Sequence, residues 1–283
     1  MLNYWLKIVC IFGCLGGALS LYTPISVGAE GLVVIGRIAQ QTADVLASYN
    51  NTLNSARNEI FVGLNDLLGW INITYTALNN TWGAKYPNLP GFVENLKELN
   101  NTVKYGESSV TWIFANDLGE LVQALDRAID PILQYYRMLT QEMPSTVNVE
   151  KCTLRNASQM ADVPNHAFKL AHCLQMESDE ITATLPAILK LISVVKLDFV
   201  SLANQLDSCH SLATTCQKQY FDQLYLEHST GTSMLSLVVQ YISSLFNDTY
   251  NRNRFCAALV QSDIQETLRN LETTYSLCAW PPS

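Results

Sequence analysis

The chain has 283 residues, of which 48% are hydrophobic and only 15% are charged, and its formal net charge is −8. An acidic chain without a basic stripe is a poor candidate for binding nucleic acid or an anionic lipid surface, so neither is expected as a partner. The length is sufficient for one large domain or two smaller ones with a buried core.

The first 20 residues are predicted to be a secretory signal peptide. One positive charge, Lys7, precedes an apolar run from Ile8 to Leu19, and small residues end the segment. We expect cleavage after Ser20, with an alternative cut after Ala29. The run is short for a bilayer span and glycines interrupt it, which disfavours an uncleaved anchor. We therefore expect a secreted, extracellular protein with no membrane span once the signal is removed.

Apolar residues recur at helical spacing throughout the cysteine-free region, residues 21–145. The first series, from Ile35 to Ile71, has no internal proline and predicts one long helix or two. A short helix is expected from Phe92 to Val103. The next series, from Phe114 to Leu139, is interrupted by Asp130-Pro131, where we expect a kink or a break.

The cysteine-rich region, residues 146–283, has the clearest pattern. From Ile181 to Leu206 the apolar residues alternate spacings of four and three, which predicts a helix of about seven turns. Shorter helices are expected at Gln217–Leu226, Met234–Leu245 and Phe255–Leu277. Breaks are expected at Gln141–Thr146, Val163–Asn165 and Ser229–Thr232.

These patterns predict an all-α fold: an elongated antiparallel bundle of long amphipathic helices, crosslinked by disulfides in its C-terminal half. Each long apolar stripe needs an equally long partner to cover it. The change in chemistry near residue 145 fits two domains, or one bundle with its crosslinks at one end. The long series favour the second interpretation.

Six cysteines remain once Cys10 and Cys14 leave with the signal peptide, and an even number in an exported chain predicts three disulfides. Cys209 and Cys216 are close enough in the chain to join one helix end to the next. The others are then expected to pair as Cys152 and Cys173 with Cys256 and Cys278, in an order that the sequence leaves open. The cysteines lack the ligand spacing of a zinc site, so neither a metal nor another cofactor is expected.

Six Asn-x-Ser/Thr triplets are candidate N-glycosylation sites because none has proline at the middle position. They begin at Asn50, Asn72, Asn79, Asn100, Asn156 and Asn247. Four of the six lie between residues 50 and 100, which predicts a sugar-coated face.

No catalytic motif is present: the chain lacks a nucleophile elbow, a zinc-protease helix and a phosphate-binding loop. No catalytic residue is therefore assigned. The acidic pairs Asp117/Glu120 and Asp179/Glu180 are interpreted as solvated helix faces or caps. We interpret His166 as an exposed or core-edge residue, and the same holds for His172.

Aromatic residues crowd the cysteine-rich region. They either fill a helical core, which we favour, or line a pocket for a small apolar ligand between helices. They are Tyr220, Phe221, Tyr225, Tyr241, Tyr250 and Phe255.

The cysteine-rich region resembles the TsetseEP-domain family of insect secreted proteins over about residues 150–278. The resemblance rests on the close cysteine pair in Asp207-Ser208-Cys209-His210-Ser211-Leu212-Ala213-Thr214-Thr215-Cys216, and on Cys256 and Cys278 flanking the last expected helix. The Glu-Pro repeat tail of the namesake protein is absent. The resemblance implies an extracellular, non-enzymatic protein, connected in some members with gut or haemolymph defence, and it supplies no functional residue.

The sequence thus favours a secreted non-enzymatic glycoprotein that acts through interaction with an extracellular protein or surface, in defence or reproduction. The alternative is an extracellular carrier of small apolar ligands in a helical-bundle pocket.

Overall fold

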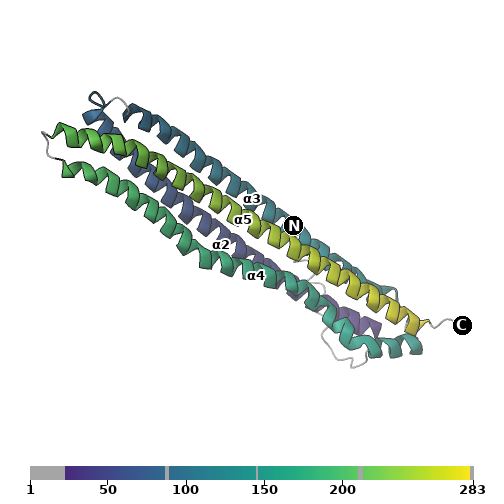
Figure 1. Cartoon of the computed structure of the whole chain (residues 1–283). Helices are drawn as coiled ribbons and strands as arrows, with labels where there is room; N and C mark the ends of the chain where they lie inside the picture. Colours follow the sequence, from purple (N-terminus) through teal and green to yellow (C-terminus); the bar gives the residue numbers. More distant parts are fainter. Residues whose placement is uncertain (1–22, 87–88, 145, 210–212, 281–283) are drawn as a thin grey trace. The chain divides into compact units, whose positions relative to one another are not determined.

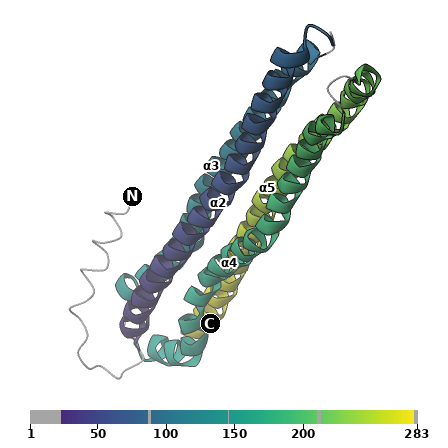
Figure 2. The same cartoon turned by 90° about the vertical axis from the view of Figure 1, so that its left-hand side faces the viewer.

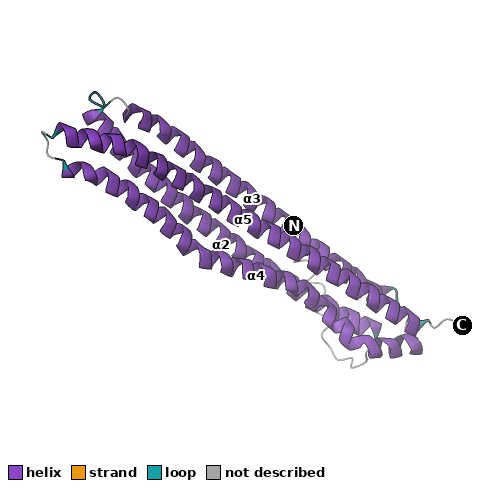
Figure 3. Ribbon diagram, in the orientation of Figure 1, coloured by secondary structure: helices purple, strands orange, loops and turns teal. Residues whose placement is uncertain are grey.

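The computed structural model describes residues 23–86, 89–144, 146–209 and 213–280, and these residues form long α-helices joined by short connections (Figure 3). The predicted signal peptide, residues 1–20, lies outside them. The helices are α2 (Pro24–Trp82), α3 (Leu89–Gln141), α4 (Val147–Asn204) and α5 (Thr214–Ala279), and a short 3-10 helix, η1 (Gln205–Ser208), follows α4 (Figure 1). No strand occurs in these described ranges, and the predicted all-α class is confirmed.

The helices are longer than the sequence patterns indicated. α2 is one helix, and α3 unites the expected short helix with the series that follows it. α3 continues through Pro131, and α4 continues through Val163–Asn165, where a break was expected. A proline removes one hydrogen bond from a helix, but the residues around it can still hold the helix together by packing. Val163 and Ala167 are both fully buried on the same side of α4.

α5 also passes without interruption through Ser229–Thr232, so the break predicted there is wrong. The hydroxyl of Thr230 donates to the carbonyl of Leu226, and those of Thr232 and Ser233 donate to the carbonyl of Ser229. These side chains thus hydrogen-bond within the helix instead of turning the chain. The expected break at Gln141–Thr146 is confirmed, because α3 ends and α4 begins there.

The chain divides into two compact units, and every long helix contributes to both. Unit 1 comprises the described parts of Met1–Asn50, Asn116–Glu177 and Asn251–Ser283, and unit 2 comprises Asn51–Ala115 and Ser178–Tyr250. The boundary between the two units does not coincide with the boundary near residue 145 between the cysteine-free and cysteine-rich regions. Each combines segments from the cysteine-free and cysteine-rich regions, because an amphipathic segment of either region is covered by segments of the other.

The predicted apolar series form the cores of the two units. Ile35 and Tyr136 are fully buried in unit 1, and Leu64, Ile71 and Phe199 are fully buried in unit 2. Each such side chain contributes about 1.5–3 kcal/mol through its transfer from water. No helix in the described part of the chain combines the length and the apolar character needed to cross a membrane.

α3 and α5 lie side by side and run in the same direction within each unit. In unit 2 a Cβ on Gly106 would lie 2.4 Å from Val239, and the rings of Phe114 and Phe246 are 4.8 Å apart. The residue numbers of the contacting pairs therefore rise together along α3 and α5, which shows that the two helices run in the same direction. Because Val239 lies so close, position 106 of α3 has no room for a side chain larger than that of glycine.

α4 and α5 are antiparallel neighbours in each unit (Figure 2). In unit 1 the hydroxyls of Thr153 and Tyr275 are 3.0 Å apart. In unit 2 the hydroxyl of Tyr220 donates to the carbonyl of Leu202 at 3.0 Å. This pairing places the cysteines of α4 opposite those of α5.

Candidate functional site

Three disulfides crosslink the helices, in the pairing that the sequence favoured. The outer bridge (Cys152–Cys278) and the inner bridge (Cys173–Cys256) both join α4 to α5 in unit 1. The loop bridge (Cys209–Cys216) connects the residue after η1 to the first turns of α5 in unit 2. The structure decides the order that the sequence left open, because antiparallel helices pair the first cysteine of one with the last of the other. Three disulfides are compatible with an extracellular protein.

Five of the six candidate glycosylation sites lie on accessible parts of the helices. Asn72 and Asn247 are exposed, and Asn50, Asn79 and Asn100 are partly exposed. Asn156 differs from these five. It is only 4% exposed, and its amide nitrogen donates to the carbonyl of Cys152 at 2.8 Å. A glycan on that nitrogen does not fit this fold, so we no longer expect Asn156 to be modified.

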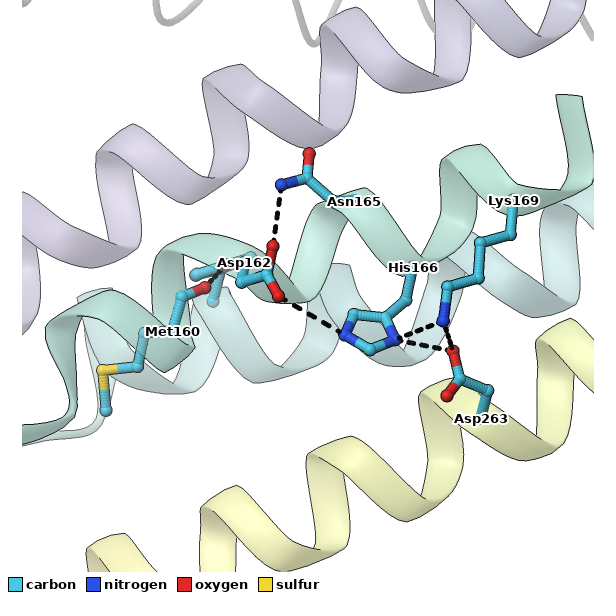
Figure 4. A network of polar contacts seen from close by, with 7 residues as sticks. Met160, Asp162, Asn165, His166, Lys169 and Asp263 are labelled. Atoms are coloured by element: carbon cyan, nitrogen blue, oxygen red, sulfur yellow. Dashed lines mark hydrogen bonds and ion pairs between the residues drawn. The ribbon is translucent and has the colours of Figure 1, made fainter. Parts of the chain in front are cut away.

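His166 belongs to a network of polar contacts between α4 and α5 in unit 1 (Figure 4). Its Nδ1 lies 2.6 Å from Oδ2 of Asp263, and the same oxygen accepts a hydrogen bond from Lys169 at 2.7 Å. Its Nε2 lies 3.8 Å from Asp162, to which Asn165 donates. Burial alone would raise the pKa of Asp263, but the hydrogen bonds from Lys169 and His166 hold that pKa below its usual range.

This network fits an ion pair between neighbouring helices better than a catalytic centre. The polar partners of His166 in the described chain are carboxylates and a lysine, and a serine nucleophile is not among them. His172 is exposed, as expected. No group of three His, Cys, Asp or Glu side chains within the described residues is arranged to hold a metal ion.

The six aromatic residues considered for an apolar pocket do not gather at one place. Tyr220 and Phe221 are buried in unit 2, where Phe221 packs on Trp82 of α2 and on Tyr86, which follows that helix. Tyr241 is 49% exposed. Phe255 is 67% exposed in unit 1, so the described members of this group do not line one cavity. The side chain of Tyr225 lies outside the described residues.

Asp117 is the main correction to the expected solvated carboxylates. It is only 2% exposed and lies among helices of unit 1. Its Oδ2 accepts a hydrogen bond from the Tyr49 hydroxyl of α2 at 2.7 Å and another from the Asn253 amide of α5 at 2.9 Å. The same amide nitrogen also donates to the Tyr49 oxygen at 2.7 Å. Three helices thus meet in one buried polar cluster.

The burial of this cluster changes its acid–base chemistry. Desolvation raises the pKa of Asp117 to about 6, and the nearby charges of Glu177 and Glu120 act in the same direction. The hydrogen bonds from Tyr49 and Asn253 oppose this rise but do not cancel it. The pKa of Tyr49 is also well above its usual range, first through burial and then through the charge of Asp117.

Asp117 and Asn253 also line a groove between α3 and α5 in unit 1, with a volume of about 360 Å³. Alanines at 124, 257 and 258 line part of its walls, and small side chains at facing positions leave the space open. Glu120 and Arg254 pair across it at 2.9 Å, and both are about half exposed. The groove combines a buried carboxylate with an entrance to solvent, which makes it the candidate functional site.

Searches of protein-family models, of curated proteins and of solved structures find no match to this chain. The resemblance to the TsetseEP family therefore stays a prediction.

Sequence reasoning missed the site, although part of the signal was present. Asp117 lies three residues after Phe114 and four before Leu121, which is the spacing of the buried positions on α3. A charged residue at such a position indicates either a gap in the stripe or a buried polar contact. Its partners, Tyr49 and Asn253, are 68 and 136 residues away, and no local pattern connects them.

Proposed function

We propose that this chain is a secreted, non-enzymatic glycoprotein that acts by binding a protein or a surface outside the cell. The three disulfides support the extracellular part of the proposal, because such crosslinks persist in oxidising compartments. The accessible sequons support glycosylation in the same compartment. A role in defence rests on the TsetseEP resemblance alone, and a role in reproduction is a hypothesis of the same standing.

The observation that carries the binding function is the set of large apolar side chains left exposed in unit 2. On α4 and α5 they recur at spacings of three and four, which places them on one face of each helix. Surface apolar groups are ordinary when single, but rows of them mark interaction surfaces. These residues, here called the apolar rows, are Leu191, Val194 and Leu197 of α4 and Met234, Leu237 and Tyr241 of α5.

A binding experiment with matched variants tests the proposal. The disulfide-bonded, secreted protein is tagged and its partners are captured from the native extracellular fluid. A Leu237→Asp/Tyr241→Asp variant should lose a specific partner, because charges would replace two exposed apolar contacts. Gln240→Asp introduces a charge at an exposed polar position of the same helix, and it should retain that partner. Unchanged capture by the double variant, or no specific partner at all, would contradict the proposal.

The alternative of a carrier for small apolar ligands has less support. Its motivation was the aromatic cluster, whose members are divided between buried and exposed positions. The groove of unit 1 is lined by charged and amide side chains as well as alanines. Co-purification of lipid with the native protein would revive this alternative.

A further inference from the structure

The hydrogen-bonding capacity of the Asp117 cluster is not filled by the protein. Oδ2 of Asp117 accepts two hydrogen bonds, whereas its Oδ1 is buried and has no partner among the described residues. The amide of Asn253 is oriented by its nitrogen, which donates to both Asp117 and Tyr49. Its Oδ1 is consequently left as a second buried acceptor without a donor. Buried acceptors of this kind destabilise the fold when unpaired, so a ligand that donates to them gains affinity.

The negative charge of Asp117 also has no cationic partner among the described residues that its hydrogen bonds reach. Glu177 is held by Arg252, whose Nε and Nη2 donate to its two carboxylate oxygens at 2.8 Å each. Glu120 is paired with Arg254. Asp117, in contrast, receives hydrogen bonds from a tyrosine hydroxyl and an amide of the described residues, and neither group carries a charge. Its carboxylate therefore stays a net negative charge beside the groove.

We propose that the groove between α3 and α5 of unit 1 binds a small organic ammonium ion, which donates N–H groups to Asp117 and to the amide oxygen of Asn253. Both free atoms are acceptors, so the ligand must donate, and the negative charge selects a cation. The alanine methyl groups of the walls suit a short alkyl body. The volume lies at the lower end of the range for small-molecule pockets, about 300–1,000 Å³.

Two other occupants fit the groove less well. A divalent metal prefers several carboxylate or imidazole ligands, and no such group of three occurs in the described residues. An anion would be drawn to Arg127, which lines the groove ten residues beyond Asp117 on α3. Ten residues of helix span about 15 Å, so Arg127 does not neutralise the negative charge of Asp117. That charge disfavours an anion at the Asp117 end of the groove.

Binding of the cation is expected to depend on pH, because only ionised Asp117 attracts it. The titratable and charged groups that face Asp117 are Tyr49 on α2, Glu120 on its own helix and Glu177 on α4, and α5 supplies Arg252 and Arg254 beside those glutamates. Burial and the two glutamates raise the pKa of Asp117 to about 6. By linkage, the affinity for an ammonium ion should be about tenfold lower at pH 5 than at pH 7.5.

Isothermal titration of the full-length secreted protein with propylammonium chloride in phosphate buffer tests this inference. Propanol is the neutral probe of matched size, and sodium chloride is the simple cation. We expect saturable binding of propylammonium alone, weakened at least about tenfold by Asp117→Asn, since a charge-assisted hydrogen bond is worth about 1.5–3 kcal/mol. Equal binding of propanol, saturation by sodium alone, or no saturable binding would each overturn the proposal.

A second variant tests the location of the site. Ala257→Leu fills the groove without altering the Asp117 cluster, and Ala47→Leu makes the same change at an exposed position of α2 in the same unit. Propylammonium binding should be lost in the first variant and unchanged in the second. Binding that persists in Ala257→Leu, with circular dichroism showing a folded protein, would place the ligand elsewhere and overturn the assignment. None of these outcomes depends on the binding function proposed for the apolar rows of unit 2.

Discussion

The buried carboxylate of Asp117 should make this protein more stable when it is protonated than when it is ionised. The substitution Asp117→Asn imitates the protonated form, because an amide keeps the shape of the carboxyl group and an acceptor oxygen for Tyr49 and Asn253. The variant should therefore gain stability relative to the wild type as the pH rises. The gain comes from removing a charge that burial disfavours.

The size of this effect follows from the two pKa values. The pKa of Asp117 is about 6 in the folded protein, against 3.8 for an unperturbed aspartate. A raised pKa means that the folded state binds the proton more tightly, so the free energy of unfolding falls as the pH rises from about 4 to beyond 6. Each pKa unit corresponds to about 1.4 kcal/mol, and between pH 4 and pH 7.5 the loss from this group is about 2–3 kcal/mol.

Urea unfolding of wild type and Asp117→Asn at both pH values measures this quantity. The stability difference between the two proteins should be about 2–3 kcal/mol more favourable to the variant at pH 7.5 than at pH 4. Comparing differences cancels the contributions of the titrating groups that do not interact with Asp117. Phosphate and acetate buffers avoid amines, which would stabilise the wild type if they bind in the groove. A pH-independent difference between the two proteins would refute the reasoning.

Three further predictions concern packing, crosslinks and glycans. Gly31→Ala should lower the free energy of unfolding by about 1–3 kcal/mol, because its Cβ would lie 2.1 Å from a ring carbon of Tyr136. Gly36 has open space around it, so Gly36→Ala should raise the free energy of unfolding by about 0.5–1 kcal/mol. Thermal unfolding distinguishes the two variants. Paired Cys→Ala replacement should cost about 5 kcal/mol at the outer bridge and about 2.5 kcal/mol at the loop bridge, since loop entropy grows with the length of chain enclosed. Equal shifts in urea midpoint would count against this. Asn247→Gln should remove one glycan from the mass of the protein produced through a eukaryotic secretory pathway, whereas the same change at Asn156 should leave the glycan mass unaltered.

The helical class and most of the core could be predicted from local patterns in the chain. The apolar series from Ile35 to Ile71 is buried at nearly every predicted position. The series from Ile181 to Leu206 is buried at five of its eight positions, whereas Leu185, Leu202 and Leu206 are partly exposed. Such patterns succeed because helical periodicity is local: residues three and four apart share a face whatever covers it. The cysteine count predicted three crosslinks for a similar reason, since an even number of cysteines after a predicted signal peptide can be read from the sequence. Helix lengths were underestimated because packing on both flanks can hold a helix together across a proline or a Ser-Thr-Gly-Thr segment.

Tertiary structure alone decided which helices are neighbours, and with that the site. The antiparallel pairing of α4 and α5 fixed the order of the outer and inner bridges. The parallel contact of α3 with α5 brought Asn253 to Asp117 and turned an expected surface carboxylate into a buried one. Burial raises the pKa of a carboxyl group such as that of Asp117 only where the surrounding helices together exclude water. That exclusion depends on residues more than a hundred positions apart, and no local spacing records it.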